Sequence, residues 1–348
     1  MFKGIDLSSD TATKPSLAMK KFMFDAEVGD EQKDEDPTTI QLEKIAAKLF
    51  NFEAAIFLPS ATMANEIAIC TLSNPGEVLL GAENCHLFLA ECGGPAVHAQ
   101  VVCRSIHTPT GIFTPDDIKQ QNYWARGTHH PTVSVLSIEN TTNFGGGYAW
   151  SKEELSAVMG CAKEFKIKTH LDGSRVFNAS IKTNLSTQEI AQEFDMVTIC
   201  LSKGLGCPIG ALLLFNRIHY QNVRRLKKLM GGAMRQSGIL AAAGIYALQH
   251  NITRLATDHK HAGLFAKEID KLPAKIHLIN NPPATNIVFF EWKAKNTSTT
   301  EFLNQCTKNG VRFSQVGKNK LRAMMHLDIS YHDVVRAVEI VKNICMQY

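Results

Sequence analysis

Short apolar runs alternate along the chain with longer stretches in which apolar residues recur every three or four positions. Short runs are typical of buried strands, and the longer spacing is typical of amphipathic helices, so their alternation predicts an α/β domain. We expect strands at Ala54–Leu58, Glu77–Leu80, Val97–Val102, Val133–Ile138, Lys168–Leu171, Met196–Leu201 and Ala211–Phe215. We expect helices at Pro37–Phe50, Lys152–Phe165 and Thr187–Phe194, the last beginning near Thr187 without a full capping box.

The pattern changes after about residue 250. A long helix-like region, Gly238–Ile269, leads into strand-like segments at Asn286–Phe290 and Lys320–Met325, and an amphipathic helix begins at Ser330. This predicts two domains of ordinary size. Residues 1–250 would form an N-terminal segment and a large domain, and residues 251–348 would form a small C-terminal α+β domain.

The composition is that of an ordinary globular protein, with 45% hydrophobic and 20% charged residues among 348. The net charge of +4 is modest, and no basic block indicates a nucleic-acid partner. No stretch approaches the roughly 20 apolar residues of a membrane helix, and the first residues lack the apolar core of a signal peptide. We therefore expect a cytoplasmic protein without a membrane partner. The densest basic run is expected to be a solvated helix face; it contains Arg224, Arg225, Lys227 and Lys228.

The nine cysteines are scattered singly along the chain. No CxxC pair occurs, and no histidine–cysteine cluster has zinc-like spacing. The sequence therefore predicts neither a metal site nor a redox motif.

Three expected strands end in reactive or charged residues. They lead to Glu139-Asn140, to Asp172 and to Ser202-Lys203. In open parallel sheets, ligands bind beyond the carboxyl ends of the strands. Three such endings in succession predict a shared site.

Lys203 follows an apolar strand and precedes two glycines in Leu-Ser-Lys-Gly-Leu-Gly. A buried ammonium is costly unless it is paired or converted. One use for such a lysine is a Schiff base with an aldehyde cofactor, to which glycines would give close access. The alternative is a lysine that extends to solvent or pairs with a carboxylate, and this motif alone supports both interpretations equally.

Asp172 favours the first interpretation. Pyridoxal 5′-phosphate (PLP) acts as an electron sink when its pyridine nitrogen stays protonated, which a carboxylate beneath the ring enforces. Asp172 precedes Lys203 by one strand–helix–strand unit, so both can face one crevice. Arg175 could bind a substrate carboxylate in a bidentate way. The alternative for Asp172 is a helix N-cap.

Two further segments fit a PLP site. Pro59–Asn65 joins a strand to a helix with small residues that leave backbone N–H groups for a phosphate, and Ser202 could add a hydroxyl. His86 follows another strand, where an imidazole could stack on the pyridine ring and act as an acid or base. A loop histidine held by hydrogen bonds is an equally good interpretation of His86.

Together these motifs resemble the L-threonine aldolases of the β-eliminating-lyase group, within the fold-type-I PLP enzymes. The resemblance extends over nearly the whole chain, in the family's order and near its spacing. It rests on Asp6–Thr11, Gly29-Asp30, Glu35–Pro37, Pro59–Asn65, Glu139–Thr141, Leu171–Arg175, Leu201–Gly206, Gly231–Gly238, and Arg322 with His326.

The resemblance implies a PLP-dependent transferase-like large domain with a mainly parallel sheet, and a homo-oligomer, dimer or tetramer, with shared active sites. It also implies roles for single residues. Lys203 would carry the cofactor, Asp172 would contact the pyridine nitrogen and His86 would stack on the ring. The phosphate would be held by Ala61, Thr62 and Ser202, and by Lys228 and Arg235 of a neighbouring subunit. The substrate carboxylate would be held by Ser9, Arg175 and Arg322, and His129, which has His130 beside it, would lie near the substrate hydroxyl.

The implied reaction is cleavage of the Cα–Cβ bond of a β-hydroxy-α-amino acid, such as L-threonine or L-allo-threonine, to glycine and an aldehyde. His86 or His129 would accept the hydroxyl proton, directly or through water. The alternatives are a β-eliminating lyase or racemase on the same scaffold, and a non-catalytic PLP-binding protein. Several positions depart from the family pattern: Lys33 and Ala90 stand where aromatic residues are common, Thr142 replaces a frequent histidine, and Met324 and Met325 precede His326.

Overall fold

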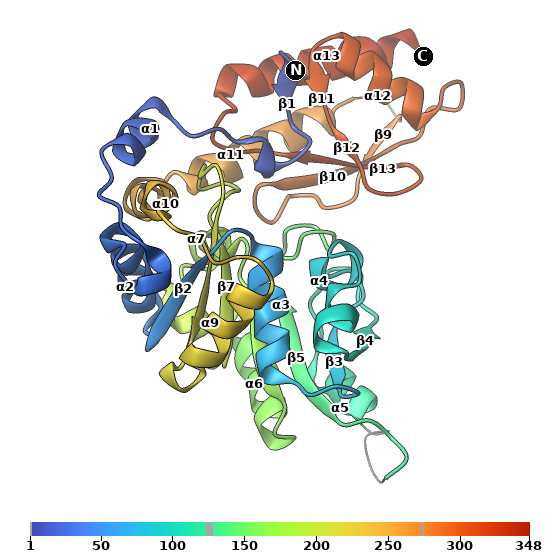
Figure 1. The fold of residues 1–348 in the computed structure, drawn as a ribbon. Coiled ribbons are helices and arrows are strands. Elements are labelled where there is room, and N and C mark those ends of the chain that lie inside the picture. The colour runs from blue at the N-terminus through green and yellow to red at the C-terminus, as the bar shows by residue number, and fades with distance from the viewer. Residues whose placement is uncertain (1, 123–127, 273–274) are drawn as a thin grey trace.

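The computed structural model describes residues 2–122, 128–272 and 275–348. Figure 1 shows a large α/β part below and a smaller part above it that contains both termini. The larger part is built on a seven-stranded sheet, and the smaller part on a four-stranded antiparallel sheet. This arrangement agrees with the predicted α/β class and the additional α+β unit.

The large sheet has the strand order β2-β8-β7-β6-β5-β3-β4. Every described pairing in it is parallel except the two made by β8, which is antiparallel to both neighbours. The carboxyl ends of the remaining strands therefore meet at one edge. The strands are β2 (Ala54–Leu58), β3 (Val78–Ala82), β4 (Val102–Ile106), β5 (Val133–Glu139), β6 (Lys168–Asp172), β7 (Met196–Cys200) and β8 (Ala211–Phe215).

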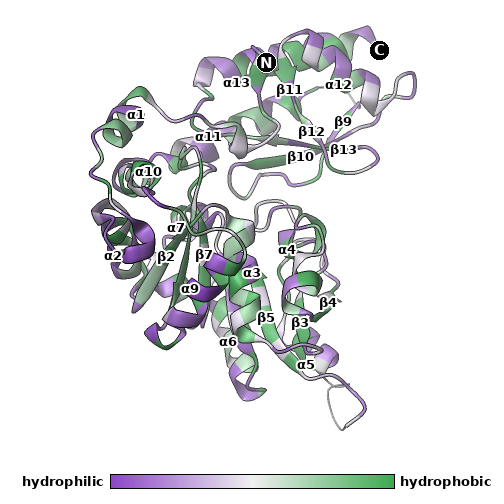
Figure 2. Cartoon of the chain, in the orientation of Figure 1, coloured by the Kyte–Doolittle hydropathy of each residue, from purple (hydrophilic) through white to green (hydrophobic). Residues whose placement is uncertain are grey.

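Helices cover both faces of the large sheet because its strands are apolar on both sides. In β2, Ile56 and Leu58 pack with α3 (Ala61–Leu72) and α9 (Tyr220–Leu229). Phe57 points to the opposite face, toward α2 (Pro37–Phe50) and α10 (Gly238–His250). Figure 2 shows the apolar sheet between more polar outer helices. Such strands read as continuous apolar runs, which is why the sequence locates them well.

The remaining helices of the large part are short or peripheral. They are α1 (Leu17–Phe24), α4 (His86–Leu89), α5 (Pro115–Asn122), α6 (Lys152–Glu164), α7 (Val176–Thr183) and α8 (Thr187–Ala191), with 3-10 turns at Asp10–Ala12, Glu31–Lys33 and Arg217–His219. None of the helices in the described ranges has both the length and the apolar character needed to span a lipid bilayer.

The smaller part has its own apolar core. Its sheet has the order β12-β13-β10-β9, formed by Ser314–Gln315, Lys320–Met324, Ile287–Trp292 and Ile276–Leu278. Helices α11 (Leu255–Ile269), α12 (Thr299–Lys308) and α13 (Tyr331–Gln347) pack against it. The start of the chain joins this core: β1 (Ile5–Asp6) pairs with β11 (Val311–Arg312), and Leu7 is buried there. The predicted boundary near residue 250 remains a prediction, but residues 5–7 pack with the C-terminal part.

One expected strand was wrong. Val97–Val102 contains a single turn of π-helix at Pro95–Ala99, and the strand begins only at Val102. Gln100 adopts a left-handed conformation with φ of 56°, which interrupts an extended run. The true strand, β4, lies at the sheet edge with Val102 and Cys103 exposed, so its apolar signal is weak.

Two helix predictions also need correction. The expected helix Gly238–Ile269 is two helices, separated by a turn after Asn251, whose side-chain amide donates to the Leu205 carbonyl at 2.8 Å. The helix near Thr187 begins after Ser186, and a complete capping box joins Ser186 to Glu189. The sequence prediction took Thr187 as the start of the helix, one residue after the true N-cap, and therefore missed the capping box.

Candidate active site

Asp172 is the last residue of β6 and Lys203 follows the neighbouring parallel strand β7, so both lie at the same sheet edge. Asp172 is 3% exposed. Burial alone would raise its pKa, but the positive charge of Lys203 and the N–H of Ser174, 3.1 Å from Oδ1, outweigh burial and lower it. The structure therefore holds a buried, ionised carboxylate near a lysine amine, as the sequence predicts.

The glycines after Lys203 serve the backbone. Gly206 has a φ of +78°, which favours glycine, and a Cβ on Gly204 would lie 2.7 Å from a Leu255 methyl group. Thr13 donates its hydroxyl to the Lys203 carbonyl at 2.8 Å. These contacts fix the loop against the smaller part of the protein, so the expected role in cofactor access is not needed to explain the glycines.

The N-terminus of α3 lies at the same edge, directly after β2. Ser60 is the N-cap and accepts from the N–H of Met63 at 3.2 Å. Ala61 and Thr62 occupy the first turn, whose N–H groups have no acceptors within the helix. Ser202 lies within 3.5 Å of Cys200 Sγ at the end of β7. This arrangement suits an anion such as a phosphate.

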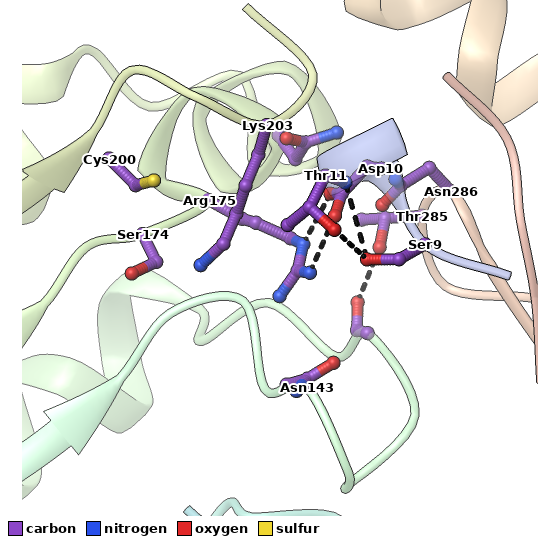
Figure 3. A network of polar contacts seen from close by, with 12 residues as sticks. Ser9, Asp10, Thr11, Asn143, Ser174, Arg175, Cys200, Lys203, Thr285 and Asn286 are labelled. Carbon is purple, nitrogen blue, oxygen red and sulfur yellow. Dashed lines mark hydrogen bonds and ion pairs between the residues drawn. The ribbon is translucent and has the colours of Figure 1, made fainter. Parts of the chain in front are cut away.

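Arg175 is held by a buried bidentate ion pair with Asp10. Its Nε and Nη2 donate to Asp10 Oδ2 and Oδ1 at 2.7 and 2.9 Å (Figure 3). Asp10 is 1% exposed, and burial alone would raise its pKa. The charge of Arg175 outweighs burial and lowers the Asp10 pKa to about 2. Asp10 thus fixes the guanidinium plane, while Nη1 is not engaged by Asp10.

Arg322, on β13, approaches from the smaller part of the protein. Its Nη1 donates to Asn143 Oδ1 at 2.8 Å and its Nη2 to the Ser8 carbonyl at 3.2 Å. Its buried Nε has no hydrogen-bond partner among the residues that the structure describes. Burial and the nearby charge of Arg175 lower the Arg322 pKa to about 10. No described carboxylate pairs with the Arg322 guanidinium, which lies near the positive charge of Arg175. Two neighbouring guanidinium groups indicate a site for an anionic group.

Figure 3 places Ser9, Asp10, Arg175, Asn143 and Lys203 around one space. Ser9 caps the 3-10 turn, and its Oγ accepts from the N–H of Thr11 at 3.2 Å. The predicted residues Ser9, Arg175 and Arg322 thus come from three distant segments to the same place.

His86 begins α4, after β3, and its Nδ1 lies 2.8 Å from Oε1 of Glu91. The same Glu91 oxygen accepts from Asn65 Nδ2 at 2.8 Å, and Asn65 Nδ2 lies 3.2 Å from Asp172 Oδ2. The hydrogen bond to Glu91 raises the His86 pKa, against the effect of burial. His86 therefore belongs to a network that reaches Asp172, which favours a functional interpretation over a loop histidine.

The beta-eliminating lyase family matches residues 6–295 of this chain, a span that contains Asp10, Asp172 and Lys203. The chain belongs to this family.

Curated relatives agree with that assignment. The low specificity L-threonine aldolase of Escherichia coli K12 is 37% identical over 326 residues, covering 94% of this chain and 95% of the relative. Low-specificity L-threonine aldolase 1 of Arabidopsis thaliana is 34% identical over 340 residues, covering 96% and 94%. The predicted resemblance to the threonine aldolases is confirmed.

Solved structures confirm the fold. The threonine aldolase of Leishmania major has a TM-score of 0.83 at 22% identity, covering 98% of this chain and 99% of that one. A serine palmitoyltransferase of S. paucimobilis, solved with bound PLP–myriocin, has a TM-score of 0.75 at 14% identity, covering 99% and 88%. This beta-eliminating lyase therefore has the fold-type-I architecture that the sequence predicted.

Two predicted residues of this beta-eliminating lyase, Lys228 and Arg235, lie outside the cluster. Both are exposed on the segment from α9 to α10. Arg235 Nη1 lies 2.7 Å from Asp30 Oδ2, and Lys228 Nζ lies 2.6 Å from Gln32 Oε1. The acidic segment 30–34, which departs from the family pattern, therefore holds both side chains.

The basic run on α9 was wrongly expected to be a uniformly solvated face. Lys227 is 2% exposed and pairs with Glu31, and Arg224 pairs with Asp34. The 190-residue separation of such partners explains why the sequence pattern did not reveal them.

His129 also lies outside the cluster. It is exposed in a turn before β5, whereas Glu139 ends that strand at the site. Six strand steps separate residues 133 and 139, about 20 Å along the strand. Within one chain of this beta-eliminating lyase, His129 is therefore not brought to Lys203.

Sequence reasoning assigned no role to several residues of the site, namely Asp10, Asn65, Glu66, Glu91 and Asn143. Asp10 lies in the Asp-Leu-Ser-Ser-Asp-Thr motif, which offered a signal. Glu66 and Glu91 are buried acidic residues in apolar surroundings, but their burial is visible only in the fold.

Proposed function

We propose that this chain is a PLP-dependent aldolase that cleaves the Cα–Cβ bond of a β-hydroxy-α-amino acid of the L-threonine or L-allo-threonine type, giving glycine and an aldehyde. The relatives from E. coli and A. thaliana are L-threonine aldolases that match almost the whole chain. The observation that carries the proposal is Arg322 beside Arg175. Arg175 is paired with Asp10, while Arg322 is bonded to uncharged acceptors and keeps a buried Nε that no described residue contacts by a hydrogen bond.

The residues present fit PLP as the cofactor. Lys203 offers an amine, and Asp172 is a buried carboxylate that stays ionised, the state that a protonated pyridine nitrogen requires. The first turn of α3 with Ala61 and Thr62, and the Ser202 hydroxyl, would hold the phosphate. When bound, PLP supplies an electron sink for the pair of electrons released at Cα.

The side chains of this chain would divide the remaining work. Arg175 and Arg322 bind the substrate carboxylate and thereby orient the bonds at Cα. Asp172 keeps the proton on the pyridine nitrogen. His86, held at Nδ1 by Glu91, accepts the β-hydroxyl proton at Nε2, directly or through water. Lys203 anchors the cofactor and releases the product.

A second candidate is β-elimination or racemization on the same scaffold. The family description names β-elimination, and the same arginines would bind any α-amino acid. The products separate the candidates, because elimination from a β-hydroxy amino acid gives an oxo acid and ammonia, whereas cleavage gives glycine and an aldehyde.

The deciding experiment is a panel of β-hydroxy amino acids, in both configurations at Cβ, assayed for glycine and aldehyde. We expect stoichiometric glycine and aldehyde from at least one threonine isomer. Oxo acid with ammonia as the products, or no glycine from any member, would overturn the proposal. If the panel shows a preference for bulkier substrates, Lys33 and Ala90 are the residues to replace, because aromatic residues are common in the family at both positions.

We also propose a homo-oligomer, dimer or tetramer, in which neighbours share sites. Lys228 and Arg235 are exposed and fixed by segment 30–34, so they can reach the phosphate of an adjacent subunit. The exposed position of His129 away from its own site fits the same role toward a neighbour's substrate. A cytoplasmic location also remains a proposal, and the absence of disulfides among the nine cysteines supports it.

Arg235→Ala is expected to weaken PLP binding by about 10- to 100-fold, because a hydrogen bond to a charged group contributes about 1.5–3 kcal/mol. The measurement is PLP titration followed by fluorescence. Asp30→Asn is the matched control, since it removes the negative charge beside Arg235 but leaves the guanidinium. If sites are shared, mixed oligomers of Arg235→Ala and Lys203→Ala subunits regain activity; unchanged PLP affinity and no recovery would contradict the assignment.

A further inference from the structure

Two buried glutamates lie side by side behind His86. Glu66, on α3, is 3% exposed, and Glu91, in the turn after α4, is 4% exposed. Their carboxyl groups are within hydrogen-bonding reach of each other. Oε1 of Glu91 accepts from His86 and Asn65, but within the described ranges Oε2 of Glu91 and both oxygens of Glu66 are buried without a hydrogen-bond donor.

The backbone at Gly94 closes the space around Glu66. A Cβ at this position would lie 2.1 Å from Glu66 Oε1, so a residue larger than glycine would displace the Glu66 carboxyl group. The N–H of Gly94 donates to the Glu91 carbonyl at 2.8 Å. This hydrogen bond fixes the turn that carries Glu91 and Gly94. The carboxyl pair is thus enclosed by α3 and this turn.

A pair of ionised carboxylates cannot persist in such a place. Two adjacent negative charges would repel each other in a medium of low polarity, and three oxygens would lack hydrogen bonds. One proton on the pair removes the repulsion and supplies the missing donor at the same time. We propose that Glu66 holds this proton and donates a hydrogen bond through it to Oε2 of Glu91. The resulting acid–carboxylate pair fixes the Nδ1–H tautomer of His86.

The charges around the pair support this distribution of protons. Burial, followed by the charge of Glu91, raises the Glu66 pKa to about 8, so Glu66 keeps its proton at neutral pH and loses it as the pH rises above that value. Burial also raises the Glu91 pKa, but the hydrogen bonds from His86 and Asn65 partly offset that rise, so Glu91 is the better acceptor of the pair. Other titratable groups near these residues include Cys70 on α3, Cys85 before α4, Cys103 on β4, Glu139 on β5, Asp172 on β6, Lys203 after β7 and Arg225 on α9, with exposed Cys92 and His98 beside Gly94.

The consequence concerns the reactive atom of His86. A carboxylate that accepts from Nδ1–H leaves Nε2 as the ring atom with a lone pair. Glu91 and Glu66 act through His86 and are positioning residues. This part of the inference rests on the proposed function, in which His86 accepts the substrate hydroxyl proton.

Infrared spectroscopy of the PLP-loaded protein tests the proton on Glu66 without turnover. The wild-type protein is expected to show a protonated-carboxyl band at neutral pH that disappears in the alkaline range. Glu43 and Glu139 also have a pKa of about 7 because of burial, so the band is assigned from the wild-type minus Glu66→Gln difference. Glu153→Gln, at an exposed position on α6, is the control and is expected to give no difference. An unchanged band in Glu66→Gln would overturn the proposal.

Nitrogen-15 NMR of histidine-labelled protein tests the tautomer, with the His86 signal assigned as the one missing from His86→Phe. We expect Nδ1–H in the wild type and in Glu66→Gln, whose amide keeps the donor to Glu91. Glu91→Gln is expected to lose this preference and to lower the His86 pKa. The same tautomer and pKa in Glu91→Gln would contradict the proposal.

Kinetics link the pair to the reaction. Glu66→Leu, which lacks the donor, is expected to lower kcat by about 10-fold with little change in KM, because an unsatisfied buried acceptor costs about 1–3 kcal/mol. Glu66→Gln is expected to restore most of that loss and to abolish the alkaline limb of the kcat profile. A fall in Glu66→Gln equal to that in Glu66→Leu would contradict the proposal. The infrared and NMR measurements do not depend on turnover. If both give the expected result in a protein that releases no glycine, the aldolase function is contradicted but the Glu66–Glu91 pair is supported.

Discussion

Lys203→Ala is expected to abolish covalent attachment of PLP and to lower kcat by about 10²–10⁴-fold, the range found for a positioned group that takes part in the reaction. The reason is the location of Lys203, whose amine lies near the buried Asp172 carboxylate and whose carbonyl is fixed by Thr13. The measurements are the visible absorption band of the holoenzyme, its loss on treatment with borohydride, and glycine release.

The control for this variant is Lys182→Ala, a lysine on the last turn of α7 that has no place in the site. It should keep the absorption band and the activity. Full turnover in Lys203→Ala would show that another amine holds the cofactor, and a borohydride-insensitive spectrum in the wild type would reject covalent PLP altogether.

Arg322→Met is expected to raise KM for the amino acid by roughly 10²-fold, with a smaller effect on kcat. Removing one partner of a buried charged contact commonly costs about 2–5 kcal/mol, and the Nε of Arg322, which has no partner among the described residues, keeps a donor for the substrate carboxylate. Methionine keeps much of the side-chain volume, so the effect reports the lost charge and donors more than lost packing.

A substrate analogue separates this role from a structural one. An amino alcohol, in which a hydroxymethyl group replaces the carboxyl group, should bind the wild type and Arg322→Met about equally poorly. Arg322→Lys should recover only part of the affinity, because an ammonium lacks the planar, bidentate geometry of a guanidinium. Equal KM values for the amino acid in all three proteins would place its carboxylate elsewhere.

The parts of the fold that the sequence predicts best are those whose signal is local. β2 and β8 coincide with their predicted bounds because strands that are buried on both faces are continuous apolar runs. Asp172 and Lys203 were found together because strand ends at one sheet edge are close regardless of loop details. The edge strand β4 was misplaced because its residues are half-exposed and carry little apolar pattern.

The parts that escaped prediction depend on contacts between distant segments. Asp10 meets Arg175 across 165 residues, and Arg322 reaches Asn143 across 179. Neither spacing has a periodicity that sequence inspection can detect. The Glu66–Glu91 pair escaped for another reason, since acidic residues are normally solvated and only the packing around Gly94 reveals their burial.

The pairing of β1 with β11 has a consequence for the order in which the protein is completed on the ribosome. Residues 5–6 are synthesised long before their partners at 311–312. Asp10, only four residues beyond β1, reaches Arg175 from this tether. A nascent chain can therefore assemble the large sheet while residues 5–10 wait undocked, and the arginine site becomes complete only when the part that contains β11 folds back over these residues.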